Sequence, residues 1–251
     1  MNAAEQKRAM PLESALALAG KELYSYVNSP VSYGIGVFFL LFVSLWFFYF
    51  NRFFALNVAS LRPYFAGFPL AFILVIPVLT MKSWAEERKL GSIELLLTMP
   101  FSEWDLVLGK FISSFIVLAL IIGLTIPVPL TLLPLGEFDG GVILGEYAGA
   151  LLLGASATAL GLLLSSLSKN QGGAFLGSAA ALLSVMLATQ LAQAVNLPLW
   201  LAEGINFFSL SFHFETFAKG IIDTKDAAFF ILTTVGFLFL NTRVLLFRKW
   251  G

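Results

Sequence analysis

The sequence of 251 residues contains no cysteine and a single histidine. Without thiols the chain has no disulfide framework, no thiol nucleophile and no thiolate metal ligand. One imidazole, that of His213, excludes a multi-histidine metal site, so we expect no bound metal. Charged residues are scarce as well, at 12%, with 15 Lys and Arg against 15 Asp and Glu. This zero net charge argues against nucleic-acid binding.

Long apolar runs occupy most of the chain. Hydrophobic residues make up 59% of the sequence and the mean hydropathy is +0.88, whereas soluble domains carry roughly 25% charged residues. The runs are near or above the ~20 residues that cross a bilayer, and the last reaches that length if Arg243 snorkels. They are continuously apolar, which argues against the alternating segments of a membrane β-barrel. We predict an all-α integral membrane protein with a single transmembrane domain, whose six spans cover residues 31–50, 64–81, 105–134, 146–167, 174–195 and 227–247.

Two further segments flank the predicted spans. Residues 12–29 form an amphipathic helix that we expect on the inner membrane surface, because Leu12, Leu16, Ala19, Leu23 and Val27 fall within about 80° of a helical wheel. The outer segment 196–226 is rich in aromatic rings but interrupted by charges. We expect it to form one or two helices that dip into the outer interface.

Basic residues predict the orientation, since Lys and Arg are retained on the cytoplasmic side. With the N-terminus inside, eleven basic residues lie near cytoplasmic span ends and four lie outside. Both termini are therefore expected in the cytoplasm. The four outer residues are Arg52, Arg62, Lys219 and Lys225.

The segment from Lys82 to Lys110 holds nine of the chain's 30 charged residues in 29 positions. Within it, Ser92 is a candidate N-cap for a short helix over residues 93–99, with Glu94 in the first turn and Pro100 as its stop. Ser102 and Asp105 then have capping-box spacing and begin the third span. The segment is thus predicted to form a short helix, a break at Pro100 and the start of a second helix.

Several chemistries are disfavoured by the sequence. No GxxxxGK[ST] motif occurs, so the chain lacks that ATP-hydrolysing site and binds no cofactor of its own. Ser156, in a literal Gly-Ala-Ser pattern, resembles the nucleophile of rhomboid-type proteases, but helix packing through small residues explains it better. The span interiors hold no ionisable residue apart from Arg243, which disfavours an ion relay.

The charged segment carries a family resemblance. The run EERKLGSIELLLTMP at residues 86–100, followed by Leu108-Gly109-Lys110, resembles the signature between spans two and three of type-2 ABC transporter permeases. Residues 21–30 and 214–226 are similar, more narrowly, to the branch that serves gliding motility and nitrous oxide reductase maturation. The resemblance covers essentially the whole chain.

The resemblance implies a permease subunit without enzymatic activity, in the inner membrane of a bacterium. Two cytosolic ATPase subunits, holding ATP and Mg²⁺, would dock on residues 82–104, which contain the coupling helix, and a second permease subunit would pair in the bilayer. The function implied is substrate translocation, with export expected. The alternative is a non-transporting anchor that transmits ATPase motion to a periplasmic or surface partner.

The resemblance also nominates residues for these roles. The docking and coupling candidates are Glu86, Glu87, Arg88, Gly91, Ser92, Glu94 and Pro100. Weaker candidates line the translocation path, namely Pro77, Thr80, Ser184 and Gln190. The candidates for an outer gate are Phe207, Phe208, Phe212 and Phe214.

Overall fold

The computed structural model describes residues 11–56, 60–93, 101–194 and 198–250, and these form helices joined by turns and loops, with no strand among them. Six helices are long and apolar enough to cross a membrane, which confirms the predicted fold class. The spans run over Pro30–Ala55, Arg62–Lys89, Glu103–Leu135, Gly140–Leu167, Gln171–Gln190 and Thr224–Phe247. The chain is thus a multi-pass helical bundle.

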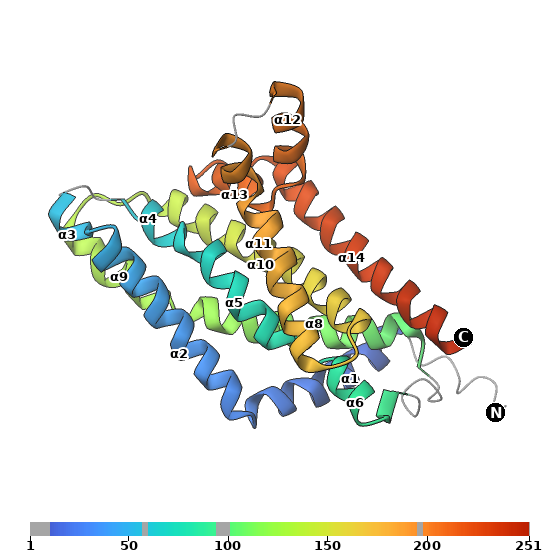
Figure 1. Cartoon of the computed structure of the whole chain (residues 1–251). Helices are drawn as coiled ribbons and strands as arrows, with labels where there is room; N and C mark the ends of the chain where they lie inside the picture. The colour runs from blue at the N-terminus through green and yellow to red at the C-terminus, as the bar shows by residue number, and fades with distance from the viewer. Residues whose placement is uncertain (1–10, 57–59, 94–100, 195–197, 251) are drawn as a thin grey trace.

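The elements follow one another in chain order and most are joined by short connections (Figure 1). Their bounds are α1 Pro11–Val27, α2 Pro30–Leu45, the π-helix η1 Trp46–Phe50, α3 Phe53–Leu56, α4 Arg62–Phe65, α5 Gly67–Thr80, α6 Ala85–Lys89, α8 Glu103–Gly123, α9 Pro127–Leu132, the 3₁₀-helix η2 Leu133–Leu135, α10 Gly140–Leu167, α11 Gln171–Ala194, α12 Leu199–Phe208, α13 Leu210–Ala218 and α14 Thr224–Trp250.

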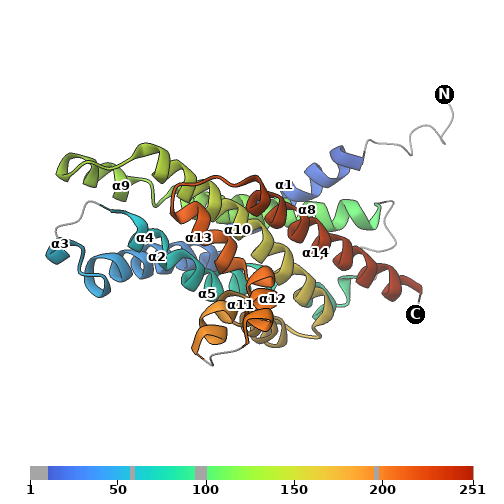
Figure 2. The same cartoon turned by 90° about the horizontal axis from the view of Figure 1, so that it is seen from above.

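Helix α10 is the central element of the bundle. It packs against α5, α8, α11, α13 and α14, as the two views indicate (Figures 1 and 2). Its small residues admit these neighbours: a Cβ on Gly154 would lie 2.7 Å from Leu118, and one on Gly161 would lie 2.5 Å from the Thr80 hydroxyl. The small-residue pattern of the fourth span therefore marks close helix contacts.

The start of α10 differs from the predicted span. The helix begins at Gly140 and not near Glu146, because the Asp139 side chain caps it by accepting from the Gly141 N–H at 2.8 Å. Glu146 consequently lies inside the span, fully buried. The expectation of spans free of ionisable residues apart from Arg243 is wrong at this position.

The two ends of the bundle carry different elements. We call them the α1 end, with α1, α6 and the α10–α11 turn, and the α12 end, with α12, α13 and α3 (Figure 1). At the α12 end His213 is buried: its Nδ1 lies 2.7 Å from Asp226 and its Nε2 lies 3.1 Å from the Phe207 carbonyl. This pair ties α13 to the start of α14.

Candidate functional site: the charged junction at the α1 end

Helix α1 lies along the first half of α8. Gly109 permits the approach, since a Cβ there would stand 3.0 Å from the Ala15 carbonyl and 2.8 Å from Leu18. Leu16 and Val27, on the predicted apolar face, are exposed, whereas the neighbouring face with Ala15 and Leu18 is buried. The helix therefore presents one face to α8 and leaves part of its predicted apolar stripe free.

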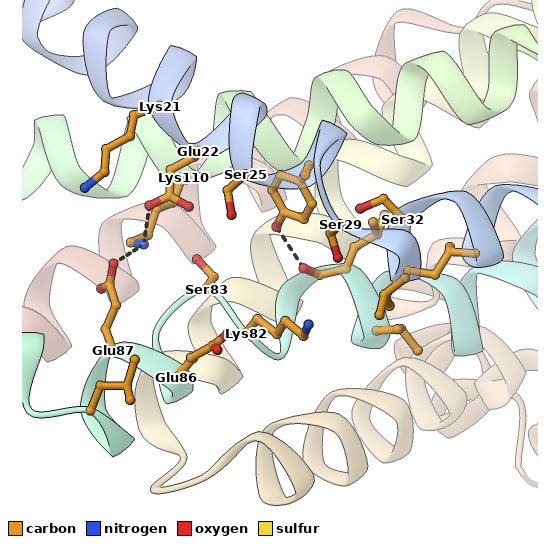
Figure 3. A pocket seen from close by; sticks show the side chains of 16 residues that line it. Lys21, Glu22, Ser25, Ser29, Ser32, Lys82, Ser83, Glu86, Glu87 and Lys110 are labelled. Atoms are coloured by element: carbon orange, nitrogen blue, oxygen red, sulfur yellow. Dashed lines mark hydrogen bonds and ion pairs between the residues drawn. The ribbon is translucent and has the colours of Figure 1, made fainter.

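A buried lysine joins three separate elements at this end. Lys110 of α8, only 1% exposed, donates from Nζ to Glu22 of α1 at 2.9 Å and to Glu87 of α6 at 2.7 Å (Figure 3). The same ammonium lies 4.9 Å from the ring centroid of buried Trp84. A buried cation requires such partners, because an uncompensated one costs several kcal/mol. We call Glu22, Trp84, Glu87 and Lys110 the charged junction.

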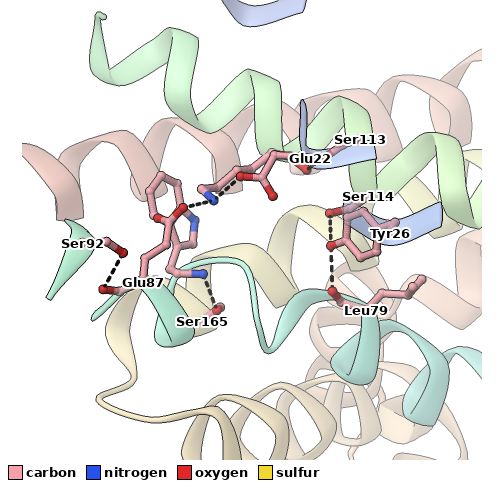
Figure 4. Close-up of polar contacts among 10 residues, drawn as sticks. Glu22, Tyr26, Leu79, Glu87, Ser92, Ser113, Ser114 and Ser165 are labelled. Atoms are coloured by element: carbon pink, nitrogen blue, oxygen red, sulfur yellow. Dashed lines mark hydrogen bonds and ion pairs between the residues drawn. The ribbon is translucent and has the colours of Figure 1, made fainter. Parts of the chain in front are cut away.

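Tyr26 extends the α1 contact by one turn. Its hydroxyl donates to the Leu79 carbonyl at 2.8 Å and lies 3.0 Å from Ser114 Oγ (Figure 4). Burial raises the pKa of Tyr26 to about 12, so the hydroxyl keeps its proton near neutral pH. One side chain thus connects α1 with the last turn of α5 and with α8.

Arg88 joins α6 to the opposite side of the junction. Its guanidinium donates to the carbonyls of Ser166 and Ser168, and to that of Leu167 at 3.4 Å. These are carbonyls at the C-terminal end of α10, where a cation is favourable. Nearby, the backbone N–H of Trp84 donates to Ser165 Oγ at 3.3 Å. Arg88 is therefore engaged within the chain and anchors α6 to α10.

The remaining docking candidates occupy different environments. Glu86 is partly exposed, and Gly91, just after α6, has a positive φ of 71°, a left-handed conformation that glycine adopts without a steric penalty. Ser92 is helical and its hydroxyl donates to the Glu87 carbonyl at 3.2 Å (Figure 4). Glu94, Pro100 and most of the expected helix over residues 93–99 lie outside the described residues.

The second predicted helix start is confirmed. Ser102 Oγ accepts from the Asp105 N–H at 3.1 Å, and Asp105 accepts from the Ser102 N–H at 3.0 Å, which is a complete capping box. It sets the start of α8 and thereby the register of Lys110, two turns further along the same helix.

The path and gate candidates are not gathered at one place. Pro77 and Thr80 are buried in α5, where Thr80 packs on Gly161, while Ser184 and Gln190 are exposed on α11. At the α12 end, Phe207, Phe208 and Phe212 are exposed and Phe214 is buried. Phe208 and Ser184 line one apolar pocket between α11 and α12.

The junction includes residues that sequence reasoning did not nominate. Lys110 and Glu22 are separated by 88 positions, so no local pattern pairs them. Lys89, the last residue of α6, and Leu90, its C-cap residue, are exposed at the surface, Leu90 by 72%. Within the described ranges, no group of three or more His, Cys, Asp or Glu side chains is arranged to hold a metal ion.

Comparison with known proteins gives one family match. The family described as "ABC-2 family transporter protein" matches residues 16–247, which is nearly the whole chain. No curated protein matches the chain.

Proposed function

The chain belongs to the ABC-2 family of transporter proteins and is a permease subunit of an ABC transporter, and we propose that a separate cytosolic ATPase drives it through the charged junction. The family match covers the junction together with all six spans. The finer branch, gliding motility or nitrous oxide reductase maturation, remains a proposal that rests on the resemblance of residues 21–30 and 214–226.

The observation that carries this proposal is the linkage of α6 to three helices. Glu87 ties α6 to α8 and α1 through Lys110, and Arg88 ties it to the end of α10. A displacement of α6 would therefore move elements of the bundle together, since packed helices shift as units rather than deform continuously. A short surface helix with these connections suits transmission of motion.

We place the docking surface on the exposed side of this segment. Leu90 and Lys89 are free to contact a partner, and Glu86 is partly exposed. An exposed leucine among charges suits a docking contact, in which the apolar group is buried and the charges select the partner. Glu94 and Pro100 remain docking candidates from the resemblance.

The complete assembly follows from the family. We propose two permease subunits, identical or paralogous, with two ATPase subunits that hold ATP and Mg²⁺, in the inner membrane of a bacterium. The α1 end and both termini face the cytoplasm, which the excess of basic residues near these span ends supports. Export is the proposed direction, and a periplasmic accessory protein is proposed as an additional partner.

Association with the ATPase tests the proposal. We would purify the tagged chain from membranes of its native host and measure ATP hydrolysis by the purified complex. The double variant Lys89→Glu, Leu90→Glu should lose most of the associated hydrolysis. The matched control is Lys219→Glu, Ile221→Glu at the α12 end, which should retain it.

Two results would count against the assignment. Full ATP hydrolysis by the complex of the Lys89, Leu90 double variant would show that these residues do not form the docking surface. Loss of hydrolysis in the control variant would place the docking surface at the α12 end. Transport and anchoring are distinguished by reconstitution: stimulation of hydrolysis by a translocated substrate supports export, whereas stimulation only by a periplasmic partner supports the anchor.

A further inference from the structure

An amphipathic cavity lies beside the charged junction. Its polar part, of about 350 Å³, lies between α1, the start of α2 and the α5–α6 connection (Figure 3). An apolar groove of about 370 Å³ continues between α2 and α5. Val31, Ile35 and Val78 line both spaces, so the polar cavity and the groove share a wall. A ligand spanning the two would need a polar head and an apolar tail.

The charged side chains of the polar part balance one another. Three lysines and three glutamates line it. Lys110 is engaged with Glu22 and Glu87, while Lys82 and Glu86 form no ion pair with any described residue. Those two lie one turn apart, with the Glu86 N–H donating to the Lys82 carbonyl at 3.3 Å. The cavity thus offers one cation and one anion side by side.

The sixth charged group, Lys21, is exposed, and Figure 3 shows its side chain directed away from Lys82. It lies on the side of Glu22 and Lys110. Lys82 and Glu86 are therefore the two charged groups of the lining that lie away from the charged junction and can face a ligand.

Four serines line the polar part, Ser25, Ser29, Ser32 and Ser83, and two of them lie at the start of α2. Ser29 is the N-cap residue of α2, and its side chain makes no capping hydrogen bond. Ser32 follows in the first turn, and both serines line the same cavity as Lys82 (Figure 3). An ammonium and two hydroxyls near a helix start are suitable donors for a phosphate.

The position matches the head-group layer of a bilayer. Ser29 directly precedes the span Pro30–Ala55, and Lys82 lies near the end of the span Arg62–Lys89. The groove opens outward, since Val31, Phe38 and Leu74 are each more than 40% exposed. Acyl chains of the surrounding leaflet can therefore reach it.

We propose that this cavity binds one glycerophospholipid with a zwitterionic aminoethyl phosphate head group, of the phosphatidylethanolamine type. The phosphate contacts Lys82, Ser29 and Ser32, the ammonium contacts Glu86, and one acyl chain lies in the groove. Balanced charge favours a zwitterionic over an anionic head group. The lipid site does not rest on the proposed ATPase, although Glu86 and Leu90 line the cavity and also belong to the proposed docking surface.

Native mass spectrometry of the purified chain, titrated with phosphatidylethanolamine, tests the phosphate contact. Lys82→Gln should weaken binding of one lipid about fivefold, as loss of one basic contact at a membrane surface predicts. Lys169→Gln, which removes an exposed lysine at the same end, should bind as the native chain does. Equal binding by Lys82→Gln and the native chain would overturn the site.

The head-group preference is tested with three lipids. Phosphatidylethanolamine should bind more tightly than phosphatidylcholine, whose quaternary ammonium donates no N–H hydrogen bond, and Glu86→Gln should reduce this preference. Tighter binding of phosphatidylglycerol than of phosphatidylethanolamine would overturn the zwitterionic assignment. It would instead indicate an anionic-lipid site.

The groove is tested by filling it. Gly34 lines the groove, and an added Cβ there meets nothing within 4 Å, so Gly34→Phe is the variant chosen to fill the groove. This variant should lose the bound lipid, whereas Gly236→Phe, at an equally open position on α14, should keep it. Binding of soluble glycerophosphoethanolamine as tightly as the lipid would refute the acyl-chain contact.

Discussion

Removal of the Lys110 ammonium is the sharpest perturbation of the charged junction. Lys110→Met keeps an unbranched side chain, shorter by one atom, and leaves Glu22 and Glu87 facing one another without a cation. Their Oε1 atoms lie 2.9 and 2.7 Å from the same Nζ. They are therefore within about 6 Å of each other, where two charges repel by roughly 3 kcal/mol at an effective dielectric constant near 20.

This repulsion agrees with the general cost of breaking a buried ion pair, about 3 to 5 kcal/mol. For a chain of this size each kcal/mol shifts the melting temperature by about 2 to 4 °C. We expect Lys110→Met to melt roughly 6 to 12 °C below the native chain in detergent or nanodiscs. The exposed Lys169→Met is the control and should not change the melting temperature.

A charge-free variant separates electrostatics from packing. Lys110→Met combined with Glu22→Gln and Glu87→Gln removes both the cation and the repulsion, and should recover most of the loss. A Lys110→Met variant as stable as the native chain would refute the reasoning. So would a triple variant no more stable than Lys110→Met alone.

Three further predictions follow from contacts around α1 and α13. Gly109→Ala would place a methyl 2.8 Å from Leu18 and should lower the melting temperature by several degrees, whereas Gly123→Ala in the open part of α8 should not. Tyr26→Phe loses two hydrogen-bonded contacts and should cost about 1 kcal/mol in unfolding free energy, measured as a melting shift. His213→Ala removes the link between α13 and α14 and should speed amide hydrogen exchange in α12 and α13, with exchange in α1 unchanged.

Each of these predictions has a contrary outcome. Equal melting of the two glycine variants would mean that α1 does not pack closely on α8. An unchanged melting temperature in Tyr26→Phe would show that the hydrogen bonds of the Tyr26 hydroxyl do not contribute to stability. Equal exchange in α1 and α13 after loss of the imidazole would show a global rather than local destabilisation.

Sequence reasoning recovered the fold where the determining signal is local. Continuous apolar runs identify spans because the bilayer sets their length, and Ser102 with Asp105 identifies a capping box because both residues lie within one turn. The start of α10 was misplaced at Glu146 because charge was taken as the limit of the span. The cap at Asp139 lies further upstream.

The charged junction could not be predicted in this way. Lys110 is separated from Glu87 by 23 positions and from Glu22 by 88, and only the placement of both α1 and α6 against α8 brings the three side chains together. Arg88, expected as a docking residue, donates its guanidinium hydrogen bonds to carbonyls of α10. Tertiary contacts decide which charged side chains face a partner and which are engaged within the chain. Hydropathy and periodicity of the sequence do not report these contacts.

Photo-crosslinking measures the central claim most directly. A benzophenone amino acid would replace Leu90, 72% exposed at the α1 end, and separately Ile221, 58% exposed at the α12 end. The account predicts a covalent adduct between the chain and a cytosolic ATPase from position 90 and none from position 221. An ATPase adduct from position 221, or none from position 90 in an active complex, would contradict it.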